Sequence, residues 1–557
     1  MNEFDLWIPP TQSSNLSHIF NFADIFNVNE DRRVDFVRRW YNDGGIMLMN
    51  YDQFRILLTT SSRMDDYGVM LYKPSLVILD EAHRIKNPAA SISQCVSKIQ
   101  TLRRLCLTGY PLQNNLNEYY CMLNFAFPGL LGEVTVFKAI YQKPIESVYA
   151  DSTLNVRRLA KFKLLELQLM TSDIIHRKDI SILAQELPGK TEYYIQCRLT
   201  PMQYSTYMTF LEYPKLIRTI MTQLMLFRAI CNHPAIYTRM LTNCNMISRH
   251  KAVGNINDDG DDLEPVDQDE YGAVRKYAKM LPRDWQKYGF TEEDVKHLDN
   301  SHKVQLVLAI SKLCRSKKEK LVIVSHSLVC LDFLEEILEK EEFNISKIDG
   351  RIKQRQPIID KFNDDPACEI MLLSARAGGI GVNITGANRV ILMDSDWNPS
   401  HDEQSIARLY RFGQKNHVYV YRLLTYSTVE STVNTLAQQK RGLSGRVVDN
   451  KKGKLQEETA TRSYYRTPEK DPVCQVTDQQ INELDDKILQ QVLQTWKASV
   501  VAMNVEKTNH GTSSSLDPMD DHVQPSDSDL ADMRRTARFT RANAKSYHQV
   551  LLHSFSS

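Results

Sequence analysis

The stretch SLVILDEAHRIKNPA, residues 75–89, joins a short apolar run to two carboxylates and a histidine. The run at 76–79 is too short and too rich in β-branched residues for a helix, so it predicts a buried strand of a parallel sheet. Asp80 and Glu81 follow where this strand leaves the sheet, the edge at which open α/β sheets bind ligands. Acids there commonly hold Mg²⁺ and position a water for attack on a phosphate, so a nucleotide site is predicted. The simpler alternative is two solvated acids that begin a helix and favour its dipole.

Composition limits the possible classes of protein. A chain of 557 residues exceeds one hydrophobic core, so two or three domains are expected. The apolar content of 42% and charged content of 25% are typical of a soluble protein, and a net charge of +1 leaves nucleic-acid binding open. Ten cysteines without a CxxC pair favour a reducing compartment and indicate neither a zinc ribbon nor a disulfide framework. No signal peptide or run of about 20 apolar residues is present, so no membrane partner is expected.

Alternating strand and helix patterns predict an α/β fold with two parallel-sheet domains, at residues 1–130 and 300–450. In the first, a helical pattern at 90–102 joins two predicted strands and forms a βαβ unit. The predicted strands are 44–54, 75–80 and 104–109 in the first domain, and 320–326, 369–375, 389–395 and 417–425 in the second.

Four other segments complete the predicted organisation. Residues 131–235 look mostly helical, without a clear strand, and form an insert between the two domains. Residues 236–299 include a run of eight acids without lysine or arginine, which predicts a solvated loop or hinge. Residues 451–500 are expected to form a helical extension. Residues 501–557 are expected to be a disordered tail that is rich in serine, aspartate and proline and carries the basic patch RRTARFTRANAK near its end.

Two further stretches follow predicted strands. In LTGYPLQNNL, Thr108 and Gly109 end a strand, and the stretch forms either a simple turn or a relay between the nucleotide and a second ligand. In SARAGGIGVNITGANRV, Gly378 and Gly381 allow the backbone to approach a ligand or the other domain closely. A glycine cluster alone is weak support, since strand-to-helix turns also use glycine for their geometry.

The stretch DEQSIARLYRFGQ, residues 402–414, carries the most specific pattern. On a helix, Gln404 and Arg408 are four residues apart and Arg408 and Arg411 three, so all three would share one face. Two arginines at a domain edge suit phosphate charge better than lysines, and they stabilise a transferring phosphoryl group when another domain supplies Mg²⁺. The alternative, an exposed charged helix face, requires acids as partners, and the two acids just upstream lack the spacing to reach that face.

In chain order, these motifs resemble those of the Swi/Snf-family DNA-dependent ATPases, which are of the superfamily-two helicase type. The resemblance covers roughly residues 1–450. Its motifs are DEAH, LTGxPLQNNL, RAICNHPAIY (228–237), KIDGRIKQRQ (347–356), the glycine cluster and QSIARLYRFGQ. Finer features, among them VSHSLVCLD, YRFGQ and LSGRVVD, are similar to the ATRX-like chromatin-remodelling branch. Tyr110 departs from the threonine that most relatives carry in LTGTP.

The resemblance implies a fold of two RecA-like parallel-sheet lobes, the first of them incomplete, with the helical insert between them. It implies ATP and Mg²⁺ as cofactors, double-stranded DNA and chromatin or nucleosomes as partners, and the nucleus as location. The roles that it assigns are Mg²⁺ binding to Asp80, water activation to Glu81, γ-phosphate contact to Gln404, Arg408 and Arg411, nucleotide binding to His83, Gly378 and Gly381, and DNA contact or coupling to Thr108, Gly109, Ser325, Ser374 and Arg376.

A pair of possible metal ligands stands in CNHP, at Cys231 and His233. No second pair follows at ligand spacing, so zinc is not expected there. The resemblance implies a structural role for this segment.

The phosphate-binding lysine that should accompany DEAH is missing. A phosphate loop has the pattern GxxxxGK[ST], after a strand and before a helix. The one Gly-Lys-Thr, residues 189–191, has Ala184 where the pattern needs its first glycine, lies downstream of DEAH and precedes a strand-like segment. The resemblance matches it instead to the LPxK segment after the insert. The chain is therefore expected to begin inside the first lobe, through a truncated sequence, a catalytically silent relative or a partner chain that completes the lobe.

The sequence thus predicts an ATP-dependent double-stranded-DNA translocase or chromatin remodeller of the ATRX-like type, with impaired ATP binding in the chain as printed. The alternative is a non-catalytic DNA- or chromatin-binding scaffold that keeps the two-lobe fold. An RNA helicase is disfavoured, because relatives of that type carry a different arginine pattern.

Overall fold

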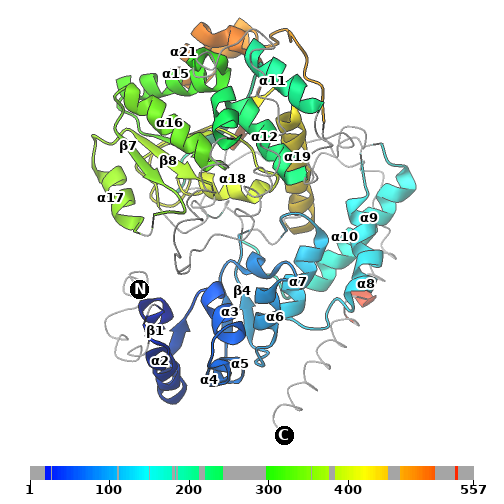
Figure 1. The fold of residues 1–557 in the computed structure, drawn as a ribbon. Helices are drawn as coiled ribbons and strands as arrows, with labels where there is room; N and C mark the ends of the chain where they lie inside the picture. Colours follow the sequence, from blue (N-terminus) through cyan, green and yellow to red (C-terminus); the bar gives the residue numbers. More distant parts are fainter. Residues whose placement is uncertain are drawn as a thin grey trace.

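The computed structural model describes residues 19–26, 28–109, 112–149, 151–178, 182, 186–212, 220–241, 297–352, 354–375, 383–448, 465–508, 534–536 and 538. Figure 1 shows a smaller first lobe in blue and a larger second lobe in green, yellow and orange, with a group of cyan helices beside the first lobe. Both lobes contain parallel strands and helices, so the predicted α/β architecture is confirmed.

The second lobe is built on one seven-stranded sheet with the order β11-β5-β10-β9-β6-β8-β7. Neighbouring strands are parallel except β11, which is antiparallel to β5. The strands are β5 (Lys190–Cys197), β6 (Leu321–Ser325), β7 (Ile345–Ile348), β8 (Ile370–Ser374), β9 (Arg389–Leu392), β10 (Val418–Thr425) and β11 (Val500–Thr508). Every residue of β6 and β8 is buried, as expected where helices cover both faces of a parallel sheet.

Helices cover both faces of this sheet. Leu321 and Ile323 of β6 pack into one apolar cluster and Val322 and Val324 into another, because alternate residues of a strand point to opposite faces. The helices against the first cluster are α11 (Pro201–Leu211), α12 (Ile220–Asn232), α15 (His302–Ser316), α16 (Leu328–Lys340), α20 (Asp478–Asn482) and α21 (Lys487–Trp496). Those against the second are α17 (Gln356–Asp364) and α18 (Pro399–Ile406).

In the described part of the first lobe, the strands form two separate parallel pairs. β1 (Ile19–Asn21) pairs with β2 (Ile46–Leu48), and β3 (Val77–Leu79) pairs with β4 (Arg104–Cys106). The helices around them are α2 (Glu30–Asp43), α3 (Tyr51–Thr59), α4 (Met64–Tyr67), α5 (Val69–Tyr72) and α6 (Ser91–Ser97). The predicted βαβ unit is therefore present as β3, α6 and β4.

The prediction that β3 is buried is wrong on one face. Leu79 is 8% exposed and packs against α6, but Ile78 is 54% exposed and Leu105 of β4 is 47% exposed. Among the described residues, β4 is the only strand that pairs with β3, and helices cover one face of the pair. The other face therefore presents apolar side chains to solvent.

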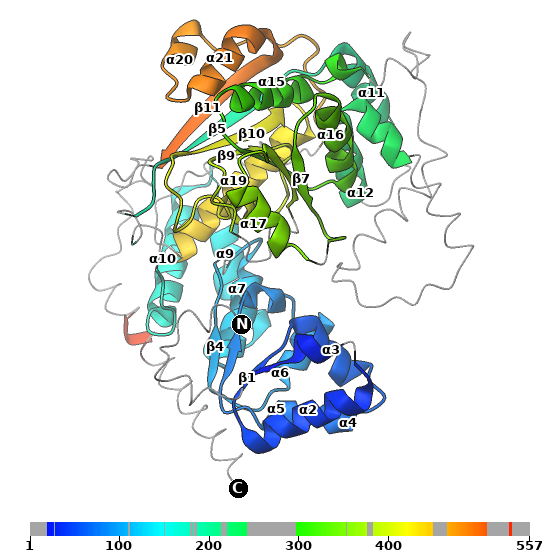
Figure 2. The ribbon, with the colours of Figure 1, turned by 90° about the vertical axis from the view of Figure 1, so that its left-hand side faces the viewer.

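The long helix α19 (Val429–Val448) connects the two lobes. Its Val429 and Val433 belong to the core of the second lobe, whereas Val447 packs with the helices α7 (Leu116–Ala126) and α10 (Leu154–Thr171) beside the first lobe. Twenty helical residues span about 30 Å, enough to join the two bodies, and both views show this path (Figures 1 and 2). No helix in the described ranges, α19 included, is long and apolar enough to cross a membrane.

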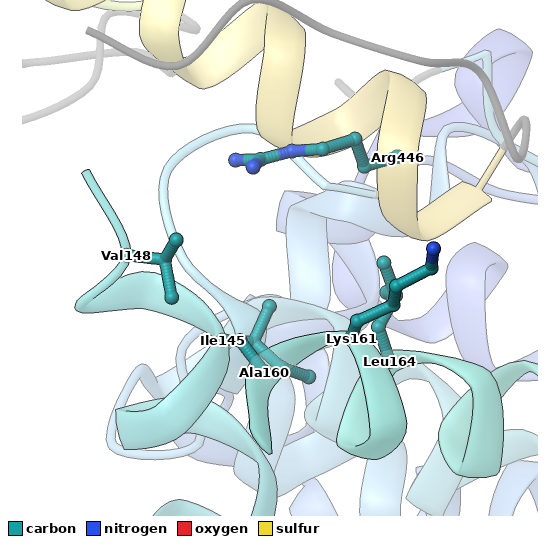
Figure 3. A pocket seen from close by; sticks show the side chains of 6 residues that line it. All are labelled: Ile145, Val148, Ala160, Lys161, Leu164 and Arg446. Carbon is teal, nitrogen blue, oxygen red and sulfur yellow. The ribbon is translucent and has the colours of Figure 1, made fainter. Parts of the chain in front are cut away.

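A small hollow lies where α19 meets the helices beside the first lobe. Figure 3 shows Arg446 of α19 above Ile145 of the short helix α9 (Lys143–Glu146) and Ala160 and Leu164 of α10. The side-chain amide of Gln168 donates a hydrogen bond of 2.8 Å to the Arg446 carbonyl and closes the contact. None of the residues predicted for catalysis lines this hollow.

Two expected boundaries differ from the structure. Three segments expected within the helical insert, Lys190–Cys197, Pro201–Leu211 and Ile220–Asn232, form β5, α11 and α12 of the second lobe. The expected helical extension contains α20 and α21, but the chain then returns to the sheet as β11, in the first residues of the expected tail. The reason is the long-range pairing: Lys190 lies opposite Val418, and such distant partners leave no local pattern in the sequence.

Parts of the predicted organisation lie outside the described residues. These are most of the acidic hinge, at 242–296, and the tail beyond Thr508 apart from 534–536 and 538.

Candidate functional site

The two carboxylates of DEAH lie at the carboxyl end of β3, as predicted. A capping box between Asn50 and Gln53 begins α3 and positions Tyr51, whose hydroxyl donates to the Asp80 carbonyl at 2.7 Å. Asp80 is exposed, and its Oδ1 accepts the backbone N–H of Glu81 at 2.9 Å. The end of the strand is therefore held by side chains of the neighbouring helix.

Glu81 has a left-handed backbone, with φ of 48° and ψ of 49°. Such a conformation is uncommon for a residue with a Cβ and costs of order 1–3 kcal/mol, so it persists where the surroundings hold it. The N–H of the next residue, Ala82, bonds the Leu107 carbonyl of the adjoining strand segment at 2.8 Å. This backbone contact holds the turn in which Glu81 lies.

Glu81, His83 and Thr108 form a chain of contacts between the ends of β3 and β4. His83 Nδ1 lies 3.3 Å from Glu81 Oε2 and 3.5 Å from the Thr108 hydroxyl. The pKa of Glu81 lies below its usual range because His83 hydrogen-bonds its carboxylate; burial opposes the shift, and the charges of His83 and Arg408 reinforce it. Gly109 follows in an exposed position where a Cβ would meet no atom within 4 Å.

The arginines of the second lobe do not continue a helix, which corrects the prediction for 402–414. Helix α18 ends at Ile406, and the Arg408 carbonyl accepts the N–H of Ile384 at 3.0 Å instead of a helical partner. Gly413 then turns the chain with φ of +95°. After Ile406 the N–H groups of Leu409 and Tyr410 both bond the Ile406 carbonyl, at 3.0 and 2.9 Å, and the contact between Arg408 and the distant Ile384 leaves no period in the sequence.

The three residues predicted to contact the phosphate are nevertheless on one short segment. Gln404 is buried within α18, and Arg408 and Arg411 are half-buried in the turns that follow it. Arg408 lies close enough to the first lobe for its charge to lower the pKa of Glu81.

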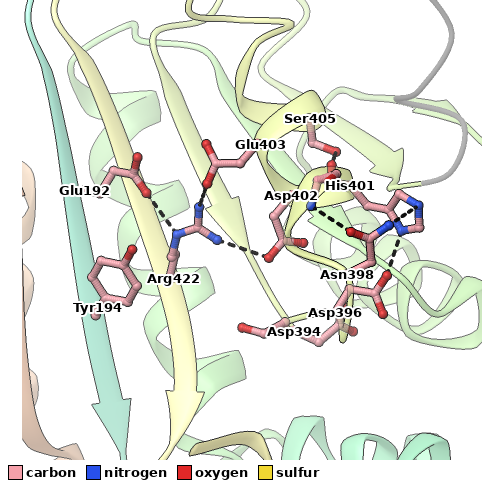
Figure 4. A network of polar contacts seen from close by, with 12 residues as sticks. Glu192, Tyr194, Asp394, Asp396, Asn398, His401, Asp402, Glu403, Ser405 and Arg422 are labelled. Carbon is pink, nitrogen blue, oxygen red and sulfur yellow. Dashed lines mark hydrogen bonds and ion pairs between the residues drawn. The ribbon is translucent and has the colours of Figure 1, made fainter. Parts of the chain in front are cut away.

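The acids beside these arginines belong to a different network (Figure 4). The guanidinium of Arg422, 1% exposed, bonds Asp402 at 3.1 Å and Glu403 at 2.9 Å, and it bonds Glu192 of β5 at 2.9 Å. Arg441 adds a second contact to Glu403 at 2.8 Å. Asp402 and Glu403 therefore serve the interior of the second lobe.

Side chains that the sequence did not single out join the two lobes. The Asn398 amide donates to the side-chain carbonyl of Gln113 at 3.2 Å, and Lys86 donates to the same oxygen at 2.8 Å. The ammonium of Lys440 donates to Asn114 Oδ1 and to the Trp397 carbonyl, each at 2.9 Å. Gln113 and Asn114 lie in LTGYPLQNNL, the motif for which a relay was predicted. The prediction named Thr108 and Gly109 at the start of the motif, whereas the contacts with the second lobe come from Gln113 and Asn114 further along it.

The remaining predicted residues divide into two groups. Ser325 and Ser374 end neighbouring strands in register, and both are buried, so they cannot contact DNA directly in this conformation. Ser325 donates to Asp394 at 2.7 Å, within the polar core of the second lobe. Arg376, Gly378 and Gly381 lie outside the described residues.

The Gly-Lys-Thr at 189–191 is not placed as a phosphate loop. Lys190 begins β5, in the interior of the second lobe, and its ammonium lies 2.5 Å from a Glu192 carboxylate oxygen. A Cβ at Gly189 would lie 2.7 Å from the His417 ring, so this glycine serves the packing of two segments.

Two family models match the chain: the SNF2-related domain over residues 20–236 and the helicase conserved C-terminal domain over residues 302–413. The chain belongs to the Swi/Snf family. The two matches fall on either side of the acidic segment, and the second contains β6 to β9, α18 and both arginines of this Swi/Snf-family chain.

Curated relatives from several branches match at similar identity. The Arabidopsis thaliana protein CHROMATIN REMODELING 20 is 30% identical, over 80% of this chain and 33% of its own length. The Drosophila melanogaster transcriptional regulator ATRX homolog is 30% identical, over 78% and 40%. The Drosophila ananassae DNA repair and recombination protein RAD54-like is 30% identical, over 83% and 53%. This Swi/Snf-family chain thus spans between a third and about half of these relatives.

Proposed function

We propose that this chain is the motor part of an ATP-dependent double-stranded-DNA translocase that remodels chromatin. The observation that carries the proposal is the placement of Glu81 at the end of β3 in the first lobe and of Arg408 and Arg411 after α18 in the second, in two lobes that contact each other through Gln113 and Asn398. Arg408 is also among the charges that hold the pKa of Glu81 below its usual range. Carboxylates on one lobe and arginines on the other are the parts that a phosphoryl transfer in a cleft between two lobes requires.

Each lobe would contribute a distinct part of the chemistry. Asp80 is an exposed carboxylate at a strand end, and oxygen ligands of this kind suit Mg²⁺, which neutralises phosphate charge when bound. The lowered pKa of Glu81 keeps its carboxylate ionised, so it could accept a hydrogen bond from the attacking water and orient it. Arg408 and Arg411 would stabilise negative charge on the transferring group, and Gln404 would support them from α18.

Coupling to DNA would pass through the contacts at the strand ends. His83 touches both Glu81 and Thr108, so a change at the carboxylate can reach LTGYPLQNNL. Gln113 and Asn114 in that motif contact Asn398 and Lys440 on the other side of the junction. Opening or closing of the lobes would therefore be linked to the state of the carboxylate site.

The ATRX-like branch and the nucleus are the finer parts of this proposal. The name of the Arabidopsis relative favours chromatin as the target, and the ATRX homolog is named a transcriptional regulator. The RAD54-like protein, named for repair and recombination, matches at the same identity. The choice of the ATRX-like branch for this chain therefore rests on stretches such as VSHSLVCLD and LSGRVVD.

A second candidate is a non-catalytic DNA-binding scaffold. The observation in its favour is that the one Gly-Lys-Thr of the printed sequence begins β5 of the second lobe, where Lys190 pairs with Glu192. Losing oriented phosphate contacts costs about 10²–10³ in rate for each donor group. We therefore expect the chain as printed to bind duplex DNA but to hydrolyse ATP negligibly.

The test compares ATP hydrolysis, with and without duplex DNA, by the printed chain and by a chain extended upstream through a GxxxxGK[ST] loop. The extended chain should show DNA-stimulated hydrolysis. Glu81→Gln should abolish that activity, and Arg408→Ala should lower it by about 10³-fold or more, the usual contribution of such an arginine. Arg103→Ala, at an exposed arginine of the first lobe, is the matched control and should leave the rate unchanged.

Two results would contradict the proposal. Rapid DNA-stimulated turnover by the printed chain, lost in Glu81→Gln, would show that the phosphates are bound elsewhere. An extended chain that binds DNA but never hydrolyses ATP would favour the scaffold.

A further inference from the structure

Two histidines and an aspartate converge at the carboxyl edge of the second-lobe sheet. His326 directly follows β6, Asp396 follows the adjacent strand β9, and His401 lies in the first turn of α18. One nitrogen from each histidine and one carboxylate oxygen lie within 4.8 Å of one another. The two histidines are far apart in the sequence, so no local sequence pattern predicts the cluster.

His326 is oriented by a buried carboxylate on its far side. Its Nε2 lies 2.8 Å from Asp402 Oδ1, and Arg422 holds the other oxygen of Asp402 at 3.1 Å. A carboxylate in this position accepts the Nε2–H and leaves Nδ1 to face the cluster, where it lies 3.7 Å from Asp396 Oδ2. Metal-binding histidines typically have such a carboxylate behind them, because it fixes the ring and makes it more basic.

The other two side chains are accessible from solvent. The His401 and Asp396 side chains are 36% and 21% exposed, and His401 Nδ1 lies 2.7 Å from Asp396 Oδ2. Figure 4 shows these side chains beside Asn398, whose amide lies 3.4 Å from His401 Nε2. An ion could reach the cluster from this side while His326 remains buried.

Charges of both signs surround the cluster: Asp402 lies behind His326, and the Arg228 guanidinium lies 3.7 Å from Asp396 Oδ1. Burial alone would lower the pKa of His326, but the carboxylates of Asp396 and Asp402 outweigh it and raise that pKa above its usual range. Burial would raise the pKa of Asp396, but the charge of His326 and the hydrogen bond from His401 hold it below its usual range. An ion at the cluster requires the neutral form of His326, in which Asp402 accepts the Nε2–H and Nδ1 carries no hydrogen.

We propose that His326 Nδ1, His401 Nδ1 and Asp396 Oδ2 form a Zn²⁺ site with three protein ligands and one open position. Zinc binds imidazole nitrogen and carboxylate oxygen at about 2.0–2.2 Å in a tetrahedron, which separates two ligand atoms by about 3.3 Å. The 2.7 Å and 3.7 Å separations from Asp396 Oδ2 bracket that value, and the two ligand nitrogens lie within 4.8 Å of each other, so rotation of the exposed His401 side chain would have to bring the three atoms to tetrahedral spacing. This site is distinct from the Mg²⁺ position proposed at Asp80.

Zinc would also affect the contact between the lobes. The residues between the ligands include Trp397 and Asn398, which bond Lys440 and Gln113 respectively. A metal bound at Asp396 and His401 ties down both ends of this loop. It would replace the hydrogen bond between His401 Nδ1 and Asp396, and a neutral His401 ring would then carry its hydrogen on Nε2.

The experiment titrates ZnCl₂ into the chelator-treated chain by calorimetry in buffers of different ionisation enthalpy, and records the visible spectrum of the Co²⁺-loaded protein. One Zn²⁺ per chain should bind, and Co²⁺ should give the intense absorption of a four-coordinate site. His401→Asn and His326→Gln should each lower the affinity at least about tenfold. The control, His297→Asn, changes an exposed histidine outside the cluster and should bind as the unsubstituted chain does.

Equal zinc affinity in the unsubstituted chain, His401→Asn and His326→Gln would overturn the proposal and assign the bound zinc to other groups, such as the cysteines. Absence of zinc binding by the unsubstituted chain would overturn it as well. His401 is half-exposed, so His401→Asn tests the site even where substitution of the buried His326 impairs folding. The readout does not involve ATP, so failure here leaves the proposed motor function untouched, and failure of the motor function leaves the zinc site untouched.

Discussion

Glu81 combines an unusual backbone with a carboxylate that lies beside His83, 3.3 Å from its Nδ1. Its φ of 48° is sterically costly for any residue with a Cβ, and its neighbours His83 and Ala82 are held by Thr108 and Leu107 of the adjoining strand segment. The carboxylate thereby leaves the sheet at the point where the charge of Arg408 reaches it. At this residue, local strain and proposed function coincide.

The strain at Glu81 predicts an ordering of two substitutions. Glu81→Gly and Glu81→Ala both remove the carboxylate, but only glycine adopts a left-handed conformation without a Cβ penalty. We expect Glu81→Gly to be more stable than Glu81→Ala by about 1 kcal/mol, as measured by urea unfolding of the two variants. Equal stability, or a more stable alanine variant, would show that the backbone at this position is relaxed.

The β3–β4 pair shows how the two faces of one short strand can have different environments. Leu79 packs against α6 and the helix that follows β4, while Ile78 and Leu105 point to the open face. An apolar sheet face that is exposed to solvent tends to associate with other chains, because removing apolar surface from water is favourable in free energy. The buried face of the β3–β4 pair therefore stabilises the fold, whereas its exposed apolar face favours aggregation.

Substitutions of adjacent residues on β3 should separate these two effects. Ile78→Thr keeps a β-branched side chain and should reduce aggregation in light-scattering measurements with little change in melting temperature. Leu79→Thr, on the buried face, should lower stability by roughly 2–5 kcal/mol, since it removes core contacts and buries a hydroxyl. If Ile78→Thr destabilises the chain as much as Leu79→Thr, both faces of β3 are covered in solution.

At the scale of the whole molecule, a few polar side chains and α19 set the relation of the lobes. Lys440 of α19 bonds Asn114 on one side and the Trp397 carbonyl on the other, and it stacks over the Trp397 ring with 4.5 Å between its ammonium and the ring centroid. Burial lowers the pKa of this ammonium from 10.5 to about 8. The junction therefore carries a lysine that titrates near physiological pH.

The lowered pKa of Lys440 predicts a pH dependence of stability. Between pH 8 and 10.5 the unfolded chain binds a proton that the folded chain has lost, so the stability from this group is complete above pH 10.5 and decreases as the pH falls towards 8. Melting temperatures measured in chelator across this range should rise with pH more steeply for the unsubstituted chain than for Lys440→Met. Lys312→Met, at an exposed lysine paired with Glu341, is the control and should keep the slope. Identical slopes in all three would show that Lys440 is solvated.

Local sequence patterns were sufficient to predict those elements that depend only on residues close together in the chain. The apolar runs of β6 and β8, the turn at Asp80 and Glu81 after β3, and the arginines near the end of α18 could all be placed from the sequence, because periodicity and strand-end chemistry are local. The order of the motifs along the chain was sufficient to identify the Swi/Snf family.

Tertiary structure alone decided the remaining features, since each depends on residues far apart in the chain. β5 joins the second lobe by pairing with β10, and the segment after α18 contacts Ile384 through the Arg408 carbonyl instead of continuing the helix. Asp402 and Glu403 are committed to Arg422, and His326 meets His401 only when β6 and β9 lie side by side. Pairing between distant segments leaves no period in the sequence, and hydrogen bonding and burial reveal it only once the chain has folded.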